Sequence, residues 1–291
     1  MTGPPLPAPG VDTVAGLFER GEFKSCCAAT YEQPVVRWLL GGELHPGGER
    51  LTRRALALAS AAPGERLLDV ASGTGISAML AARERGCETV GLDYGLSAVA
   101  EARTAAAEQR LSDRVRFVEG DAEALPFADA EFDVVVCECS LCTFPDKPRA
   151  AAEMRRVLRP GGRVAIADVV AEQERLPSQL RSAAAAVACV AEALPVTGYE
   201  ELLRGAGLDP LSREPHDEAL LAMLDTVESR LRGARVLGLA ATEPFAGMLE
   251  RAIELTSLAR GATEDGALGY AILTARVGAN DRSSADAGAT V

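Results

Sequence analysis

An apolar strand that runs directly into a glycine turn and then a helix constrains this chain more than any other feature. Residues 67–78 read LLDVASGTGISA. Gly73, Gly75 and Ala78 match the pattern G-x-G-x-x-G/A, in which missing side chains let the backbone and a cofactor approach each other closely. The segment therefore predicts a cofactor bound in the crevice above the ends of parallel strands.

Short β-branched runs alternate with helical patterns along most of the chain, as is typical of a parallel sheet covered by helices on both faces. We expect seven strands, near residues 66–71, 88–92, 114–118, 132–136, 163–169, 208–214 and 268–276. Helices are expected near residues 48–61, 76–86, 96–110, 147–158, 177–194 and 199–206. A helical insertion across 216–261 should lengthen the final hairpin and is placed to cover the site. The predicted fold class is α/β, a doubly wound, mostly parallel seven-stranded sheet.

The simplest division of the chain is one catalytic domain over residues 11–277, because no repeat or linker interrupts that region. Residues 1–10 are expected to form a flexible leader and residues 278–291 a disordered tail. Within the domain, residues 20–48 are expected to form an N-terminal helical lid with glycine joints. His45 lies in this segment and is interpreted as a turn residue.

The overall charge narrows the choice of partners. A formal net charge of −12 opposes the phosphate attraction on which non-specific nucleic-acid binding depends. The sequence shows neither a signal peptide nor an apolar run of about 18 residues, the length that a membrane span needs. We therefore expect a cytoplasmic protein that binds neither nucleic acid nor membrane.

A carboxylate, Asp93, follows the second predicted strand, where it can accept hydrogen bonds from both hydroxyls of a ribose. An NAD site would share this feature, so other residues must distinguish the cofactors. Asp69 ends the first strand, where it can orient the ammonium of an amino-acid ligand. Further along come Gly120-Asp121-Ala122, the buried run FDVVV at 132–136, and the turn LRPGG at 158–162.

This ordered set of motifs, spanning about residues 67–168, closely resembles the class I S-adenosylmethionine (SAM)-dependent methyltransferases. The resemblance implies that SAM is the cofactor. It also implies that Asp69 and the Gly73–Gly75 turn hold the methionine part, Asp93 the ribose, and Asp121 with Ala122 the adenine. The full predicted cofactor set is Asp69, Gly73, Thr74, Gly75, Asp93, Tyr94, Asp121, Ala122 and Glu138.

Three cysteines lie within six residues where the methyl acceptor is expected, after the fourth strand. Residues 137–142 read CECSLC. Small buried cysteines that fill a strand end are one interpretation, and a structural zinc is another, although half of a normal zinc ligand set is missing. A third is a soft, thiophilic substrate, because thiolates select such species. Glu138 can be an orienting group, a substrate contact or an outward-facing residue.

The cysteine positions resemble those of the arsenite methyltransferases. Cys139 and Cys189 match two cysteines that hold arsenic(III) in that family, so the resemblance implies that they are the catalytic pair and the arsenic ligands. The third thiol would come from Cys26, Cys27, Cys142 or an added small thiol. The chain departs from some family members because no cysteine lies between Cys27 and Cys87. A disulfide relay through such a residue is therefore not expected.

Two further hypotheses remain open from the sequence. One is an O- or C-methyltransferase of a small hydrophobic molecule, of the quinone or natural-product type, which would not need the cysteines. The other, from a different class, is a non-catalytic protein that binds SAM or a metalloid.

Overall fold

The computed structural model describes residue 24 and residues 28–181, 189–238 and 245–278. The predicted leader, Cys26, Cys27 and all but the first residue of the predicted tail lie outside this part of the chain.

A seven-stranded sheet forms the centre of the molecule, with strand order β3-β2-β1-β4-β5-β7-β6. Only β7 runs against the others, because it pairs antiparallel with both β5 and β6 while the remaining pairs are parallel. The predicted mostly parallel sheet is confirmed. The strands are β1 Arg66–Val70, β2 Glu88–Asp93, β3 Val115–Glu119, β4 Phe132–Glu138, β5 Leu158–Ala171, β6 Leu208–Pro215 and β7 Leu268–Val277.

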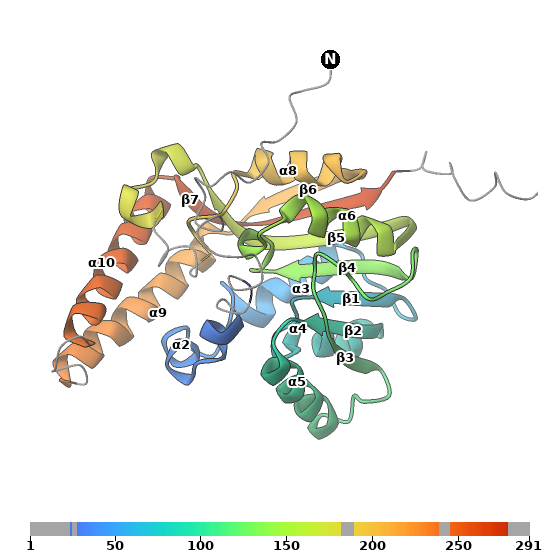
Figure 1. Ribbon diagram of the computed structural model, residues 1–291, viewed down its shortest axis with the longest axis horizontal. Coiled ribbons are helices and arrows are strands. Elements are labelled where there is room, and N and C mark those ends of the chain that lie inside the picture. The colour runs from blue at the N-terminus through green and yellow to red at the C-terminus, as the bar shows by residue number, and fades with distance from the viewer. Residues whose placement is uncertain (1–23, 25–27, 182–188, 239–244, 279–291) are drawn as a thin grey trace, which may run out of the picture.

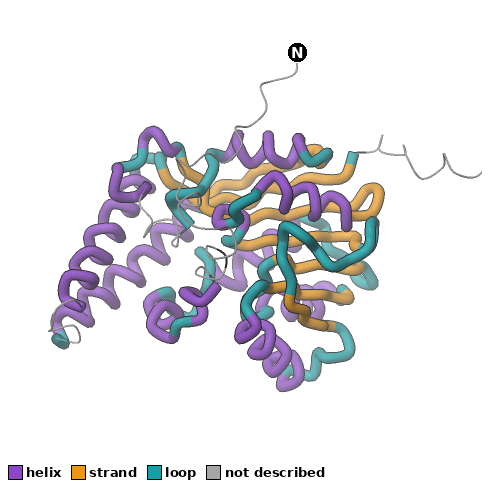
Figure 2. Tube along the Cα trace, in the orientation of Figure 1, coloured by secondary structure: helices purple, strands orange, loops and turns teal. Residues whose placement is uncertain are grey.

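Helices cover both faces of the sheet (Figure 1). Successive residues of β4 point to opposite faces, so Val134 packs with the residues of α3 and Val135 with those of α6 and α8. Figure 2 shows the same layers, with the strands in orange and the helices in purple. The covering helices are α3 Gly48–Leu58, α4 Ile76–Leu80 with a π-helical continuation Ala81–Arg85, α5 Leu96–Glu108, α6 Lys147–Val157 and α8 Val196–Gly205.

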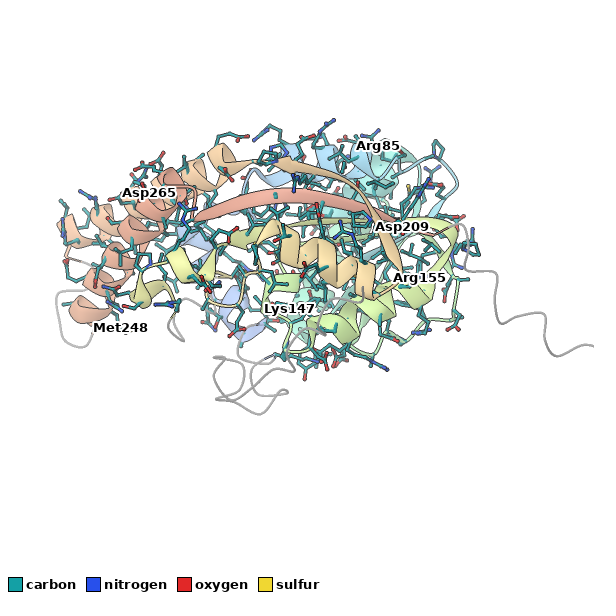
Figure 3. All side chains as sticks on the ribbon, turned by 90° about the horizontal axis from the view of Figure 1, so that it is seen from above. Arg85, Lys147, Arg155, Asp209, Met248 and Asp265 are labelled. Atoms are coloured by element: carbon teal, nitrogen blue, oxygen red, sulfur yellow. The ribbon has the colours of Figure 1, made fainter. Side chains whose placement is uncertain are left out.

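The predicted insertion is a pair of long helices, α9 Asp217–Val236 and α10 Phe245–Glu264, which pack against each other. They project from one end of the sheet, and Met248 marks the distant part of the pair (Figures 1 and 3). The short helix α2 Pro34–Leu39 packs against α9. No described residue of α9 or α10 lines the main cavity, but residues of both helices belong to the same core cluster as Cys189. That the insertion covers the site stays a prediction.

The helix predicted over 177–194 is wrong at both ends. Near the start of the predicted range, Ser178–Arg181 forms a 3-10 turn in place of an α-helix. Near its end, Cys189 adopts a left-handed backbone conformation with φ 64°. The side-chain amide of Gln173 donates to the carbonyls of Val190 at 3.0 Å and Ala193 at 2.8 Å. These bonds satisfy carbonyls that a continuing helix would otherwise have paired within itself.

Candidate functional site

A cavity of about 620 Å³ opens at the carboxyl ends of β1, β2 and β4. This is the edge of an open α/β sheet where ligands bind. Most of the predicted cofactor set lines it: Asp69, Gly73, Thr74, Asp93, Tyr94, Asp121, Ala122 and Glu138. Cys139 lines the same cavity, so the cofactor end and the cysteine end share one space.

The two glycines of the turn have different roles. Gly73 has φ 52°, and a Cβ there would meet only the Leu44 side chain at 3.5 Å. Gly75 has φ 82°, and a Cβ there would lie 2.3 Å from the ring of Phe117. Gly75 is therefore required for packing against β3 and does not line the cavity, whereas Gly73 leaves the cavity wall open as predicted.

Asp93, at the end of β2, holds the glycine turn in place. Its carboxylate accepts hydrogen bonds from the backbone N–H of Gly73 at 2.7 Å and of Gly95 at 2.8 Å. Burial raises the pKa of Asp93 above its ordinary value, although these bonds partly counteract that effect. Each carboxylate oxygen can accept more than one hydrogen bond, so Asp93 can also bind a ribose hydroxyl.

Two buried carboxylates, Asp69 and Glu138, form one end of the cavity. Asp69 is 2% exposed and accepts a hydrogen bond from the backbone N–H of Ala78 at 3.1 Å. Burial, and then the charge of Glu138, raise the pKa of Asp69 well above its ordinary value. Such an end favours a cationic group. The His45 ring lies beside Glu138, with Nε2 3.2 Å from its carboxylate, so His45 is more than a turn residue.

The N-terminal segment reaches the opposite end of the cavity. Lys24 Nζ donates to both oxygens of Asp121, at 2.8 and 2.9 Å, and to Glu123 at 2.6 Å. Burial opposes the charge of Lys24, but these partners raise its pKa above the ordinary value. Asp121, the residue expected beside the adenine, thus has an ion-pair partner from the predicted lid segment.

The structure brings the sulfurs of Cys139 and Cys189 to 4.0 Å from each other, although 50 residues separate them in the chain. Cys139 follows β4 and Cys189 follows β5, two neighbouring strands. Both have positive φ, 50° and 64°, which non-glycine residues rarely adopt. The hydroxyl of Tyr31 lies 3.3 Å from the Cys189 sulfur and lines the cavity.

Hydrogen bonds make Cys189 the most acidic thiol of this cluster. The thiols of Cys139 and Cys142, followed by Tyr31, donate to it and lower its pKa well below the ordinary value, with further help from the charge of Lys147. As the donor, Cys139 has a pKa well above its ordinary value. When Cys189 is protonated, it can instead donate to the carbonyl of Cys139 at 3.6 Å. The arrangement favours one thiolate among three cysteines.

A buried carboxylate, Asp168, supports the cluster from β5. It accepts hydrogen bonds from the backbone N–H of Cys142 at 2.9 Å and of Val169 at 2.8 Å. Burial, and then the charge of Cys189, raise the pKa of Asp168 to about 7. Lys147 begins α6, at the end of that helix facing the middle of the molecule (Figure 3).

Sequence reasoning missed Tyr31, Lys147 and Asp168 as members of this site. Asp168 carries the clearest signal, because it is a carboxylate within the apolar run 164–170. Cys137, by contrast, packs in the core on the opposite face of the sheet from Cys139. Among the described residues, no group of three or more His, Cys, Asp or Glu side chains is arranged to hold a metal ion. No helix in that part of the chain has the length and apolarity that would let it cross a bilayer.

Comparisons with known proteins agree on the type of domain. A family model described as "Methyltransferase domain" matches residues 61–214. An arsenite methyltransferase of Halobacterium salinarum is 36% identical over 56% of this chain and 42% of its own length. A 27-O-demethylrifamycin SV methyltransferase of Amycolatopsis mediterranei is 32% identical over 78% of this chain and 82% of its own length. The chain thus spans less than half of the first relative and most of the second.

The fold also resembles solved structures. A phosphoethanolamine N-methyltransferase of Haemonchus contortus in complex with SAM superposes with a TM-score of 0.72 and 20% identity. The match covers 87% of this chain and 59% of that one.

Proposed function

This chain belongs to the SAM-dependent methyltransferases, and from that membership we propose that it methylates arsenic(III), or a similar thiophilic species, held between Cys139 and Cys189. The observation that carries the proposal is the 4.0 Å separation of the two sulfurs. Cys139 lines the cofactor cavity, and Cys189, which is 1% exposed, lies buried next to it. Two bonds of about 2.3 Å, the length that thiolates form to zinc, can meet between sulfurs at this separation.

The cavity suits SAM at each of its parts. Asp69 and Glu138 provide an acidic end for the ammonium of the zwitterionic amino-acid part, and Asp93 provides acceptors for the ribose. Asp121, Ala122 and Tyr94 line the same cavity and would border the adenine. When SAM is bound, it supplies an electrophilic methyl group whose carbon–sulfur bond breaks as the acceptor attacks. The residues that line the cavity would bind SAM and orient its methyl group.

The thiol cluster suits uptake of a soft acceptor. Thiolates bind soft species more readily than thiols do, and the hydrogen bonds at Cys189 favour its thiolate. Arsenite, as a neutral trihydroxide, would exchange two hydroxides for the two sulfurs. The proton of the Cys139 thiol would leave with one hydroxide as water, whereas Cys189 would react as its thiolate, so the second hydroxide would leave as water by taking a proton from the solvent. The third substituent on arsenic would be a hydroxide, a small thiol, or one of Cys26, Cys27 and Cys142.

Once bound by two sulfurs, arsenic(III) keeps the lone pair with which it would attack the methyl carbon. Alignment of that lone pair with the departing sulfur is then the main task of the protein. Effective molarity from such positioning contributes about 7–11 kcal/mol to lowering a barrier. No general base is required for this transfer.

A methyltransferase of a small hydrophobic molecule is the second candidate, favoured by the long alignment with the rifamycin enzyme. Oxygen methylation benefits from a general base near the acceptor hydroxyl. His45 lines the cavity, but its ring nitrogens already lie 3.2 Å from Glu138 and 3.3 Å from the carbonyl of Pro46. Both nitrogens have internal partners, which makes His45 a weak candidate for that base.

The deciding experiment is incubation of the protein with SAM, arsenite and a thiol reductant, with the products measured by elemental mass spectrometry. We expect methylated arsenic from the unmodified protein and from Cys87→Ser, a matched control because Cys87 directly precedes β2, at the opposite end of the strand from Asp93. We expect no product from Cys139→Ser or Cys189→Ser. If both variants still methylate a small hydrophobic acceptor and arsenite is never a substrate, the second candidate replaces the first. SAM binding without turnover on any acceptor would indicate a binding protein.

A further inference from the structure

The carboxylate of Glu138 is a buried group in the cavity with one oxygen fully engaged and the other without a partner. Oε2 accepts hydrogen bonds from the hydroxyls of Thr52 at 2.8 Å and Ser77 at 3.0 Å, and lies 3.2 Å from His45 Nε2. Oε1 is buried and has no hydrogen-bond partner. Because nearly all buried polar atoms are bonded, such an atom facing a cavity indicates a missing donor.

The side chain of Glu138 is held in one orientation before a donor binds. Its exposed fraction is 5%, and three neighbours from α3, α4 and the preceding turn fix Oε2. The orientation of Oε1 is therefore set before any ligand arrives, which reduces the entropy lost on binding.

The charge around Glu138 indicates which donor is missing. Burial and then the charge of Glu138 raise the pKa of the neighbouring Asp69, so the two acids oppose each other's ionisation and a cation beside them would relieve that repulsion. Among the residues that the structure describes, no lysine or arginine forms an ion pair with either carboxylate. The uncharged hydroxyls of Thr52 and Ser77 and the imidazole of His45 are the other polar neighbours. A cationic donor would both satisfy Oε1 and neutralise this end of the cavity.

We propose that Glu138 Oε1 accepts a hydrogen bond from the α-ammonium group of SAM and is the principal recognition group for that end of the cofactor. Asp69 then has a different task from the direct contact expected from sequence. Its carboxyl group accepts a hydrogen bond from the N–H of Ala78, near the start of α4. The proposal rests on SAM as the cofactor and does not depend on the acceptor.

The test is calorimetric binding of S-adenosylhomocysteine and of its deaminated analogue, in which hydrogen replaces the ammonium. The unmodified protein should bind the deaminated analogue about 10- to 100-fold more weakly, the usual range for a charge-assisted hydrogen bond. Glu138→Gln should bind S-adenosylhomocysteine more weakly by a similar factor, yet bind the analogue nearly as the unmodified protein does. Such non-additivity identifies a direct contact.

Two controls make the result specific. Glu254→Gln carries the same substitution on an exposed carboxylate that pairs with Arg251 on α10, outside the cavity lining, and it should behave as the unmodified protein does. Glu138→Asp keeps the charge but withdraws the oxygen by one methylene. It should also reduce discrimination between the two ligands, and it serves if Glu138→Gln does not fold.

Equal weakening of both ligands in Glu138→Gln would overturn the proposal, because the carboxylate would then only order the cavity. Equal binding of both ligands by the unmodified protein would also overturn it. Neither measurement involves an acceptor, so a failure of arsenite methylation would leave this proposal standing.

Discussion

The hydroxyl of Tyr31 lies 3.3 Å from the sulfur of Cys189, although 158 residues separate the two in sequence. Tyr31 also lines the cavity, and Arg37 Nε donates to its backbone carbonyl at 3.3 Å. The N-terminal segment therefore does more than border the cavity. It supplies one of the hydrogen-bond donors that favour the thiolate form of Cys189, together with Cys139 and Cys142.

Replacing Tyr31 by phenylalanine should raise the pKa of Cys189, because the thiolate loses one donor while the ring is kept. Since iodoacetamide reacts with thiolates, the pH at which Cys189 alkylation reaches half its maximal rate should move upward. Mass spectrometry of the Cys189 peptide after timed alkylation measures this. Affinity for S-adenosylhomocysteine should be unchanged. An identical alkylation profile in Tyr31→Phe would show that the contact has no effect on the thiolate.

Asp93→Ala should weaken SAM binding by about 1.5–3 kcal/mol, the range for hydrogen bonds to a charged acceptor. The carboxylate also holds the backbone of Gly73, so the turn loses an internal bond as well. Asp93→Asn keeps one acceptor oxygen, so its affinity for SAM should lie between those of the unmodified protein and Asp93→Ala. Calorimetry with S-adenosylhomocysteine distinguishes them, and unchanged affinity in Asp93→Ala would remove this residue from the cofactor site.

The two glycines of the turn should respond differently to alanine. Gly75→Ala places a Cβ within 2.3 Å of the Phe117 ring at φ 82°, and should destabilise the protein by about 1–3 kcal/mol. Gly73→Ala meets only Leu44 and should cost less stability. Urea unfolding of both variants measures the difference. Equal destabilisation would mean that backbone conformation alone, without the Phe117 contact, decides the cost.

The strands at the cofactor edge could be predicted because their apolar runs lie between clear turn and helix patterns. The run 132–136 is apolar and β-branched, and the structure places β4 over Phe132–Glu138 at the centre of the sheet. The proximity of Cys139 and Cys189 follows from the same rule, since the carboxyl ends of neighbouring parallel strands meet at one edge.

The surroundings of Cys189 could not be predicted in the same way. An alanine-rich sequence favours a helix by local propensity, but contacts from Gln173 and a left-handed residue at Cys189 decide the described backbone there. Tyr31 gives no periodic signal, because its position depends on how the N-terminal segment docks against the rest of the fold. Glu138 was expected in the cofactor set, but which of its oxygens is available required the positions of Thr52 and Ser77.

The buried carboxyl of Asp168 should make stability fall with rising pH over a defined window. Its pKa is raised from 3.8 to about 7, so between these values the folded protein binds more protons than the unfolded chain. By linkage, the free energy of unfolding contributed by Asp168 decreases as pH rises through that window, by at most about 1.4 kcal/mol per pH unit.

Asp168→Asn should remove this contribution, although it also loses one of the two backbone hydrogen bonds. The variant should therefore have a lower free energy of unfolding than the unmodified protein at pH 5, and this difference should narrow or reverse by pH 8. Urea unfolding at the two pH values measures it. A constant gap would show that Asp168 titrates alike in the folded and unfolded states.

The last prediction concerns the coupling between Cys139 and Cys189. If both sulfurs bind one arsenic atom, each is half of a chelate, and losing either forfeits the effective concentration of the second ligand, about 10²–10⁴ in affinity. Each single serine variant should therefore lose nearly all arsenite binding, and the double variant should be hardly weaker than either one. Arsenite binding can be measured by equilibrium dialysis with elemental mass spectrometry, and binding of S-adenosylhomocysteine should persist throughout. Additive losses in the double variant would mean that the two cysteines act independently, and a chelated acceptor would then be excluded even though their sulfurs lie 4.0 Å apart.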